Sequence, residues 1–266
     1  MIMRTLSRLS RVRITLGYAA LLVGVSMALV YLGPRVRAQV IAQYSTNLHN
    51  LARGNLETLF GSAFVTDAGP MYFWLPCLVC LLALAELIWR SGRLAVVFVT
   101  GHIGATLLVA CGLTAAIELH WLPLKIARAS DVGVSYGAVA VLGALTAAIP
   151  TRWRPAWIGW WVPVGIAAAV LGEDFTDVGH SVALALGLLV STRLSGPARW
   201  TQTRCALLAV STIFGFFMLA HGSWSMAVAT VVGVAGAAAA ELTTRSIASR
   251  RRVELTALPP EPVLNG

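Results

Sequence analysis

Ser135 and His180 are the two residues whose types and surroundings could together support covalent chemistry. A serine hydroxyl is a weak nucleophile until a neighbouring base accepts its proton, and histidine titrates in the range that this task requires. Both residues lie within apolar stretches, where an unpartnered polar side chain is costly to bury. The pair therefore predicts an acyl-transfer site, provided that the fold brings the two side chains together.

The serine lies in the string GVSYG at 133–137, which fits the G-x-S-x-G pattern. In α/β-hydrolases that pattern needs a strand–turn–helix context, which an apolar helix cannot supply, so the hydrolase interpretation fails. A lone serine in a helix is most often a packing or back-bonding residue. A lone histidine is more often a satisfied hydrogen-bond donor between helices. The prediction therefore depends on the two residues together.

The elements that must position this pair are membrane-spanning helices. Of the 266 residues, 58% are hydrophobic and 12% are charged, whereas a soluble domain carries roughly twice that charged fraction. A helical span needs roughly 20 mostly apolar residues. Eight such stretches occur, at about 14–32, 71–89, 94–117, 133–149, 156–172, 175–192, 205–220 and 224–240. The alternating ten-residue segments of a transmembrane β-barrel are absent from the sequence.

The net charge of +9 encodes orientation rather than an affinity for nucleic acid. With the N-terminus inside, fifteen of the 20 basic residues fall in cytoplasmic segments, and five fall in outer ones: Arg35, Arg37, Arg53, Lys125 and Arg128. The excess alternates loop by loop, as the positive-inside rule requires. We therefore expect a multi-pass protein of the plasma membrane with both termini in the cytoplasm. Its partners are the lipid bilayer, including anionic headgroups, and no nucleic acid.

Topology places the two candidate residues at similar depth. Both the fourth and the sixth of the eight stretches run from outside to inside, and Ser135 and His180 lie near the start of each. Both side chains then fall in the outer part of the membrane, which is compatible with a Ser/His dyad. Cys77 and Cys80 form a CxxC motif inside the second span, where neither zinc nor a redox partner has easy access, so we expect them to be packing side chains.

Three strings resemble the rhomboid intramembrane serine proteases. In DVGVSYGAVAVLGALTAAIP (131–150), Gly133, Ser135 and Gly143 match a G-x-S motif that opens the catalytic helix and a glycine eight positions after the serine. In FTDVGHSVALALG (175–187), His180 stands among small residues at four-residue steps, which would allow tight packing against the serine helix. LAELIWRSGRLAVVFVTGHIGATLL (84–108) is similar to the rhomboid junction between the second and third spans.

The resemblance implies an all-α, polytopic membrane helical bundle. We expect a rhomboid-like six-helix core over 1–192, including an outer loop at about 33–69, then two additional transmembrane helices over 193–242. Small residues in VVGVAGAAAAEL predict a closely packed last helix, and a polar cytoplasmic tail over 243–266 is expected to be disordered. The implied activity is an intramembrane serine endopeptidase that cleaves transmembrane proteins with Ser135 and His180, and that needs no metal or organic cofactor.

The sequence also departs from the rhomboid pattern. A His-x-x-x-Asn pair on the second span normally helps to hold the oxyanion, and the corresponding positions here are Pro70 and Trp74. Losing one oxyanion donor typically costs about 10²–10³ in rate. Conceivable substitutes are Tyr136, His102, His49 and Asn50. Two alternatives follow: an inactive rhomboid-fold protein that binds or chaperones membrane clients, and an unrelated transporter or assembly factor, for which we find no inverted repeat.

Three other polar residues within or beside the spans have simpler explanations. Glu86 precedes Arg90 by four residues, which predicts an ion pair at the membrane interface. Asp177 is expected to cap the sixth helix, because acidic side chains favour helix N-termini. His102 is expected to pack among helices.

Overall fold

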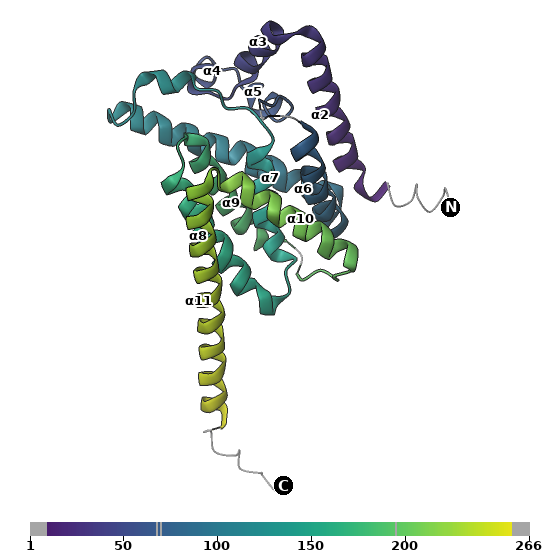
Figure 1. Ribbon diagram of the computed structural model, residues 1–266, viewed down its shortest axis with the longest axis vertical. Coiled ribbons are helices and arrows are strands. Elements are labelled where there is room, and N and C mark those ends of the chain that lie inside the picture. The colour runs from purple at the N-terminus through teal and green to yellow at the C-terminus, as the bar shows by residue number, and fades with distance from the viewer. Residues whose placement is uncertain (1–9, 68, 70, 195, 257–266) are drawn as a thin grey trace, which may run out of the picture.

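The computed structural model describes residues 10–67, 69, 71–194 and 196–256, and this part of the chain is folded almost entirely as helices, with no strand. The predicted all-α class is confirmed. Figure 1 shows the bundle with the shortest helices gathered at one end. The α-helices are α2 (Arg13–Leu32), α3 (Pro34–Tyr44), α4 (Leu48–Ala52), α5 (Thr58–Gly61), α6 (Met71–Glu118), α7 (Ser135–Ala144), α8 (Arg154–Leu171), α9 (Phe175–Ser191), α10 (Gln202–Leu219) and α11 (Ser223–Thr256).

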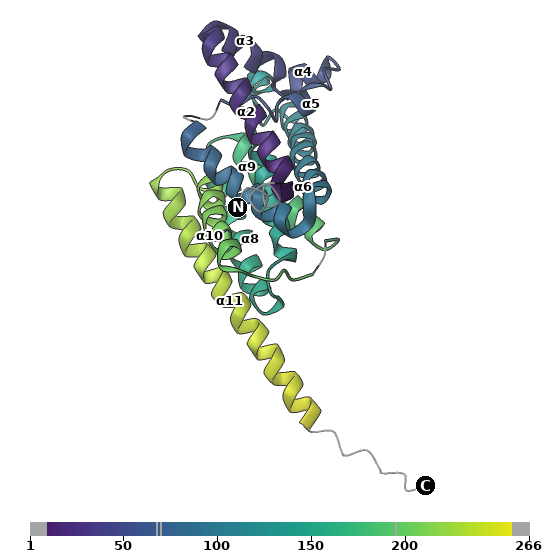
Figure 2. The same ribbon diagram turned by 90° about the vertical axis from the view of Figure 1, so that its right-hand side faces the viewer.

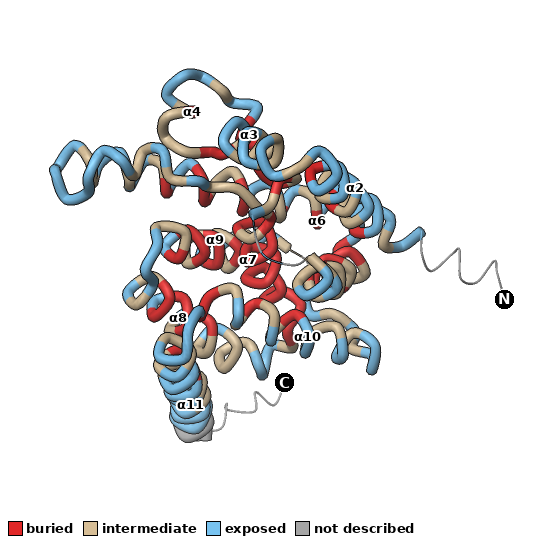
Figure 3. Tube along the Cα trace, turned by 45° about the horizontal axis from the view of Figure 1, so that its top comes forward, coloured by how far each residue is buried: buried red, intermediate tan, exposed pale blue. Residues whose placement is uncertain are grey.

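Each of the eight predicted apolar stretches falls largely in helix, and two of them lie in the two halves of α6. The stretch 133–149 covers α7 and the 3-10 turn Leu145–Ala147 that follows it. By length and composition, four of the described helices could cross a membrane: Ser10–Leu32, Met71–Glu118, Gln202–Leu219 and Ser223–Arg250. Ser135–Ala147 and Phe175–Ser191 are apolar but shorter. All residues from Tyr136 to Ala144 of α7 are buried, as Figure 3 shows at the centre of the molecule. Because α7 is surrounded by protein, lipid thickness does not set its length. The count of eight spans stays a prediction.

Arg90 divides α6 into two helices. Its backbone has φ 69° and ψ 165°, in a region that a non-glycine residue rarely adopts, and the two halves of α6 meet at an angle there (Figure 2). The predicted ion pair between Glu86 and Arg90 is wrong. An i,i+4 pair needs a continuous helix, and Arg90 breaks the helix. Glu86, which is 2% exposed, instead lies at the contact between α6 and α2.

The carboxylate of Glu86 accepts four hydrogen bonds, and three of them join α2 to α6. They come from the backbone N–H groups of Ile14 (3.0 Å) and Thr15 (2.9 Å), and from the hydroxyls of Thr15 (2.7 Å) and Ser91 (2.6 Å). A buried carboxylate is tolerated when donors satisfy its oxygens. This single side chain therefore ties the start of α2 to the break in α6.

Glycines bring α7 close to its neighbours, as the small-residue spacing predicts. A Cβ on Gly143 would lie 2.6 Å from the carbonyl oxygen of Leu184, and one on Gly187 would lie 2.1 Å from that of Ala140. On the other side, a Cβ on Gly101 would lie 2.0 Å from the Cβ of Ala140. The backbones of α6, α7 and α9 thus touch, which fixes where α7 and α9 present Ser135 and His180.

The segment 33–69, expected as an outer loop, folds as α3, α4 and α5 over one end of the bundle (Figure 1). It is tied to the chain just before α7. The N–H of Thr46 donates to the carbonyl of Asp131 (2.9 Å), the N–H of Asp131 donates to Ser45 Oγ (2.8 Å), and the N–H of Gly133 donates to the carbonyl of Ser62 (2.9 Å). These bonds fix the approach to Ser135.

The last two helices pack on the bundle. α10 lies against α6 and α7, and α11 lies along α8. At the second contact, a Cβ on Gly236 would lie 2.2 Å from the carbonyl oxygen of Gly159, so the predicted close packing of the last helix is confirmed.

The polar end of α11 differs from the sequence expectation. α11 continues to Thr256, so residues 243–256 are helical although we expected them to be disordered, and 257–266 lie outside the described residues. Ala, Glu, Leu and Arg favour helix even without tertiary contacts, and Arg245 pairs with Glu241 one turn earlier (3.0 Å). The division into a core, two added helices and a tail stays a prediction.

Candidate active site

A cavity of about 710 Å³ lies among α6, α7, α9 and α10 and holds both candidate residues. Its lining is mostly apolar, with Ser135, His180 and His221 as the main polar groups. The residues that line it are Thr66, Phe73, Trp74, Cys77, Val132, Gly133, Val134, Ser135, His180, Val210, Ile213, Phe214, Phe217, Met218 and His221.

Ser135 is the first residue of α7. The preceding Gly133 has φ +128°, a conformation that a residue with a side chain rarely adopts, and this turn aims the chain into the helix. The helix has no side-chain cap at this end. Its first backbone N–H groups have no acceptor within the helix. Ser135 lines the cavity at this open N-terminus of α7.

His180 is 7% exposed, and neither of its ring nitrogens has a hydrogen-bond partner among the described residues. Packing alone holds the ring. The ring of Tyr136 meets it edge-on with centroids 5.4 Å apart, and the ring of His221 lies 6.3 Å away, tilted by 36°. Buried polar atoms are nearly always satisfied, so an unbonded buried imidazole beside a cavity is free to bond to a ligand or nucleophile.

Ser135 and His180 share the cavity without a hydrogen bond between them, since both nitrogens of His180 are unbonded. Catalytic hydrogen bonds are often long or poorly aligned before a substrate binds. The assignment of the two residues as nucleophile and base stays a prediction.

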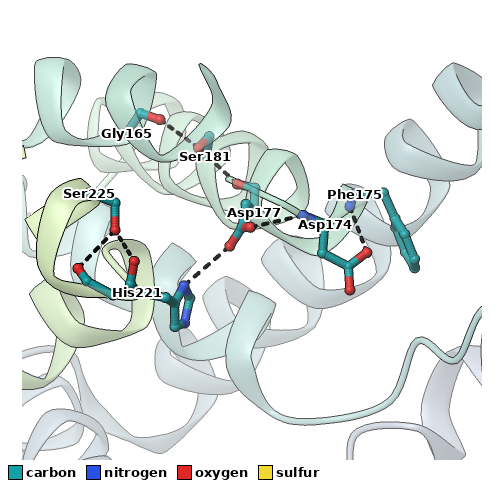
Figure 4. Close-up of polar contacts among 8 residues, drawn as sticks. Gly165, Asp174, Phe175, Asp177, Ser181, His221 and Ser225 are labelled. Carbon is teal, nitrogen blue, oxygen red and sulfur yellow. Dashed lines mark hydrogen bonds and ion pairs between the residues drawn. The ribbon is translucent and has the colours of Figure 1, made fainter. Parts of the chain in front are cut away.

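His221, in the turn between α10 and α11, is the site residue that the sequence analysis missed. Its Nδ1 lies 3.3 Å from Oδ1 of Asp177 on α9 (Figure 4). Its backbone carbonyl accepts a hydrogen bond from the hydroxyl of Ser225 at the start of α11. No sequence motif links the HGSW turn to the α9 helix, because the contact joins segments far apart in the chain.

Asp177 has two roles at the start of α9. Its Oδ2 accepts from the backbone N–H of Asp174 (3.3 Å), which completes a capping box and confirms the expected capping role. Its Oδ1 faces His221 (Figure 4). One carboxylate thus fixes both the end of α9 and the turn that carries the second histidine.

None of the four oxyanion donors suggested by the sequence lines the cavity. His102 and Asn50 are wrong candidates, because neither lines the cavity: His102 Nε2 lies 3.1 Å from Ser62 Oγ, and the Asn50 amide donates to the carbonyls of Ala42 (2.9 Å) and Ser45 (2.8 Å). His49 also lies outside the lining. Tyr136 contacts His180 with its ring.

The positions expected for the rhomboid oxyanion pair hold no such pair here. Trp74 lines the cavity, but its indole N–H is enclosed and lacks a partner in the described chain. Pro70 lies outside the described residues. The cysteines of the CxxC motif are free and half-buried. No cluster of three metal-ligating side chains occurs in the part of the chain that the structure describes.

An all-helical bundle with long apolar helices, and with a mostly apolar cavity among them, defines a polytopic membrane protein. The sequence model of a family described as rhomboid-like protein matches residues 11–199, so this chain belongs to the rhomboid-like family. No curated protein and no solved structure matches the sequence. The match includes Ser135 and His180 and ends before α10. His221, in the turn between α10 and α11, therefore lies outside the matched region.

Proposed function

We propose that this protein is an intramembrane serine protease that cleaves transmembrane segments of other proteins. One observation carries the proposal: Ser135 and His180 line the same cavity, and both nitrogens of the buried His180 ring are free of other partners. A base that has no competing hydrogen bond is available to the serine hydroxyl. Membership of the rhomboid-like family supports the same chemistry.

In the proposed reaction, Ser135 Oγ attacks the scissile carbonyl carbon while His180 accepts the hydroxyl proton. The tetrahedral intermediate collapses, the peptide C–N bond breaks, and His180 returns the proton to the leaving amine. Water then attacks the acyl-enzyme with His180 again as base, which releases the carboxyl product and restores Ser135. The residues that we assign to this cycle need no metal or organic cofactor.

The cavity wall supports lateral access of a substrate helix. Phe73 on α6 is 72% exposed, and Ile213 and Phe217 on α10 are 59% and 53% exposed. These apolar side chains line the cavity and also face outward, as a surface in contact with lipid would. A substrate helix entering between α6 and α10 would have to unwind to present its carbonyl to Ser135.

The proposed function includes an orientation in the plasma membrane with both termini in the cytoplasm. The excess of arginine in alternate loops supports cytoplasmic termini in the plasma membrane. This arrangement puts α3–α5 and the cavity at the outer leaflet, so cleavage would release the extracellular part of a substrate.

A second function is favoured by one specific observation. Trp74 occupies the place expected for an oxyanion donor, and Ser135 and His180 are not hydrogen-bonded. A rhomboid-like protein without proteolytic activity would use the same apolar cavity to hold an exposed transmembrane segment of a client.

The two functions are separated by labelling the purified protein with a fluorescent fluorophosphonate and by incubating it with a panel of single-span substrates. A protease labels at Ser135, and both labelling and cleavage are lost in Ser135→Ala and His180→Ala. Ser211→Ala is the matched control, because its buried hydroxyl bonds only within α10, to the carbonyl of Leu207 (2.7 Å). Wild-type protein that binds the substrates without cleaving or labelling would favour the client-binding function.

A further inference from the structure

The cavity lacks a second recognised donor for the negative charge that acyl transfer creates. Hydrogen-bond donors aimed at the oxyanion usually supply the largest single contribution to such catalysis. The backbone N–H of Ser135, at the uncapped start of α7, is one donor. Trp74 does not supply an evident second one, because its indole N–H is enclosed by protein.

His221 is positioned to act as the second hydrogen-bond donor to the oxyanion. It lines the cavity that contains Ser135 and His180, and its ring lies 6.3 Å from the ring of His180. Its side chain is 58% exposed, so a bound molecule can reach it. Because Nδ1 faces Asp177, the opposite nitrogen, Nε2, is the one left for a ligand (Figure 4).

With Nδ1–H of His221 directed at Asp177, Nε2 is a donor in the ring that carries a proton on both nitrogens. Asp177 faces it directly at 3.3 Å. A second hollow of about 520 Å³ on the other side of His221 is also lined by Glu173, Asp174 and Asp177. Among the residues that line the main cavity, the other titratable side chains are His180 and Cys77. Tyr136, on α7, contacts the ring of His180.

We propose that His221 donates a hydrogen bond from Nε2 to the oxyanion formed at Ser135, and that Asp177 positions it. This inference rests on the proposed protease function. The α10–α11 pair then completes an active site that the region matched by the family leaves without its second donor. His221 only donates a hydrogen bond as charge develops on the substrate oxygen, and no atom is transferred to or from it.

The inference predicts a bell-shaped dependence of Ser135 reactivity on pH. The reaction needs neutral His180 to accept the serine proton, which gives the acidic limb, and protonated His221 to donate to the oxyanion, which gives the alkaline limb. His221→Gln keeps a donor that cannot titrate, so the alkaline limb disappears while part of the rate remains. His221→Ala removes the donor and slows the reaction by about 10²–10³-fold.

The test is the second-order rate of fluorophosphonate labelling of the full-length protein between pH 5 and pH 9, for wild type, His221→Gln and His221→Ala. His120→Asn is the matched control: His120 is exposed, lines no cavity that we describe, and has φ +60°, which asparagine tolerates. Thermal unfolding of each variant shows whether it is folded. Loss of the alkaline limb in His221→Gln alone supports the inference.

Three results would overturn the role of His221, and the first two are distinguishable from failure of the protease function. His221→Ala that labels at the wild-type rate, with Ser135→Ala still inactive, would remove the role of His221 and leave the protease proposal intact. A uniform loss of rate at every pH in His221→Gln, together with a lower unfolding temperature, would assign His221 a structural role. Wild-type protein that does not label at any pH would remove both proposals.

Discussion

Asp177 Oδ1 lies 3.3 Å from His221 Nδ1, and this contact joins the start of α9 to the turn between α10 and α11. The same carboxylate caps α9 through its other oxygen. His180 is three residues further along α9, so the position of the proposed base and the position of the second histidine depend on one side chain. The two C-terminal helices therefore form part of the wall of the site as well as covering the bundle.

Replacing Glu86 tests what holds α2 on the bundle. Glu86→Ala leaves two backbone N–H groups and two hydroxyls without their acceptor. Unsatisfied buried donors cost about 1–3 kcal/mol each, and relaxation recovers part of this, so we expect the free energy of unfolding to fall by about 3 kcal/mol. Unfolding in detergent, followed by tryptophan fluorescence, measures the change.

Glu241→Ala is the control for that experiment. Glu241 pairs only with Arg245 on an exposed part of α11, and such pairs contribute about 0.5 kcal/mol or less. Equal stability of the two variants would contradict the role given to Glu86.

Gly187→Ala tests the contact between the serine and histidine helices. Its added methyl would lie 2.1 Å from the carbonyl oxygen of Ala140, so α7 and α9 must separate. Overpacking of this kind costs about 1–3 kcal/mol. We expect lower stability together with slower labelling of Ser135, because His180 moves with α9.

Gly112→Ala is the matched substitution, since nothing lies within 4 Å of a Cβ at that helical position. Alanine favours a helix over glycine by about 1 kcal/mol, so this variant should be at least as stable as wild type. A tolerated Gly187→Ala, with unchanged labelling, would show that the close packing is not required.

The contact between the α3–α5 segment and the chain before α7 should depend on pH. Burial, opposed by the hydrogen bond from Thr46 and aided by the nearby Asp174, raises the pKa of Asp131 to about 6. Because the folded protein favours the protonated carboxyl, this stabilisation is complete below pH ~4, the usual pKa of aspartate, and is lost as the pH rises through about 6. Hydrogen exchange over residues 45–62 should therefore be slower at pH 5 than at pH 8, after correction for intrinsic rates.

Asp131→Asn mimics the protonated carboxyl and should abolish this difference, leaving the segment protected at both pH values. Thr46 can still donate to the asparagine carbonyl oxygen, as it does to Asp131 Oδ2 (3.2 Å). A variant that retains the pH dependence would assign it to another group.

Features encoded locally were predictable from the sequence. The apolar stretches predicted the helices, because the hydrogen bonds of a helix join residues within the same stretch. The spacing of Gly143 and Gly187 predicted the close contact of α7 with α9. The predicted Glu86–Arg90 ion pair failed because α6 breaks at Arg90, and because Glu86 bonds to α2, a segment far away in the sequence. His221 was missed for a related reason: its partner Asp177 is brought near only when α10 folds across α6 and α7.

The proposed function depends on Ser135 acting as a nucleophile that His180 activates. Fluorophosphonate labelling of the purified protein, with the modified residue identified by mass spectrometry, measures this reactivity. We expect stable modification of Ser135 in wild type and in Ser211→Ala, and none in Ser135→Ala or His180→Ala. Wild-type protein that is not modified at Ser135, or a His180→Ala variant modified as fast as wild type, would contradict it.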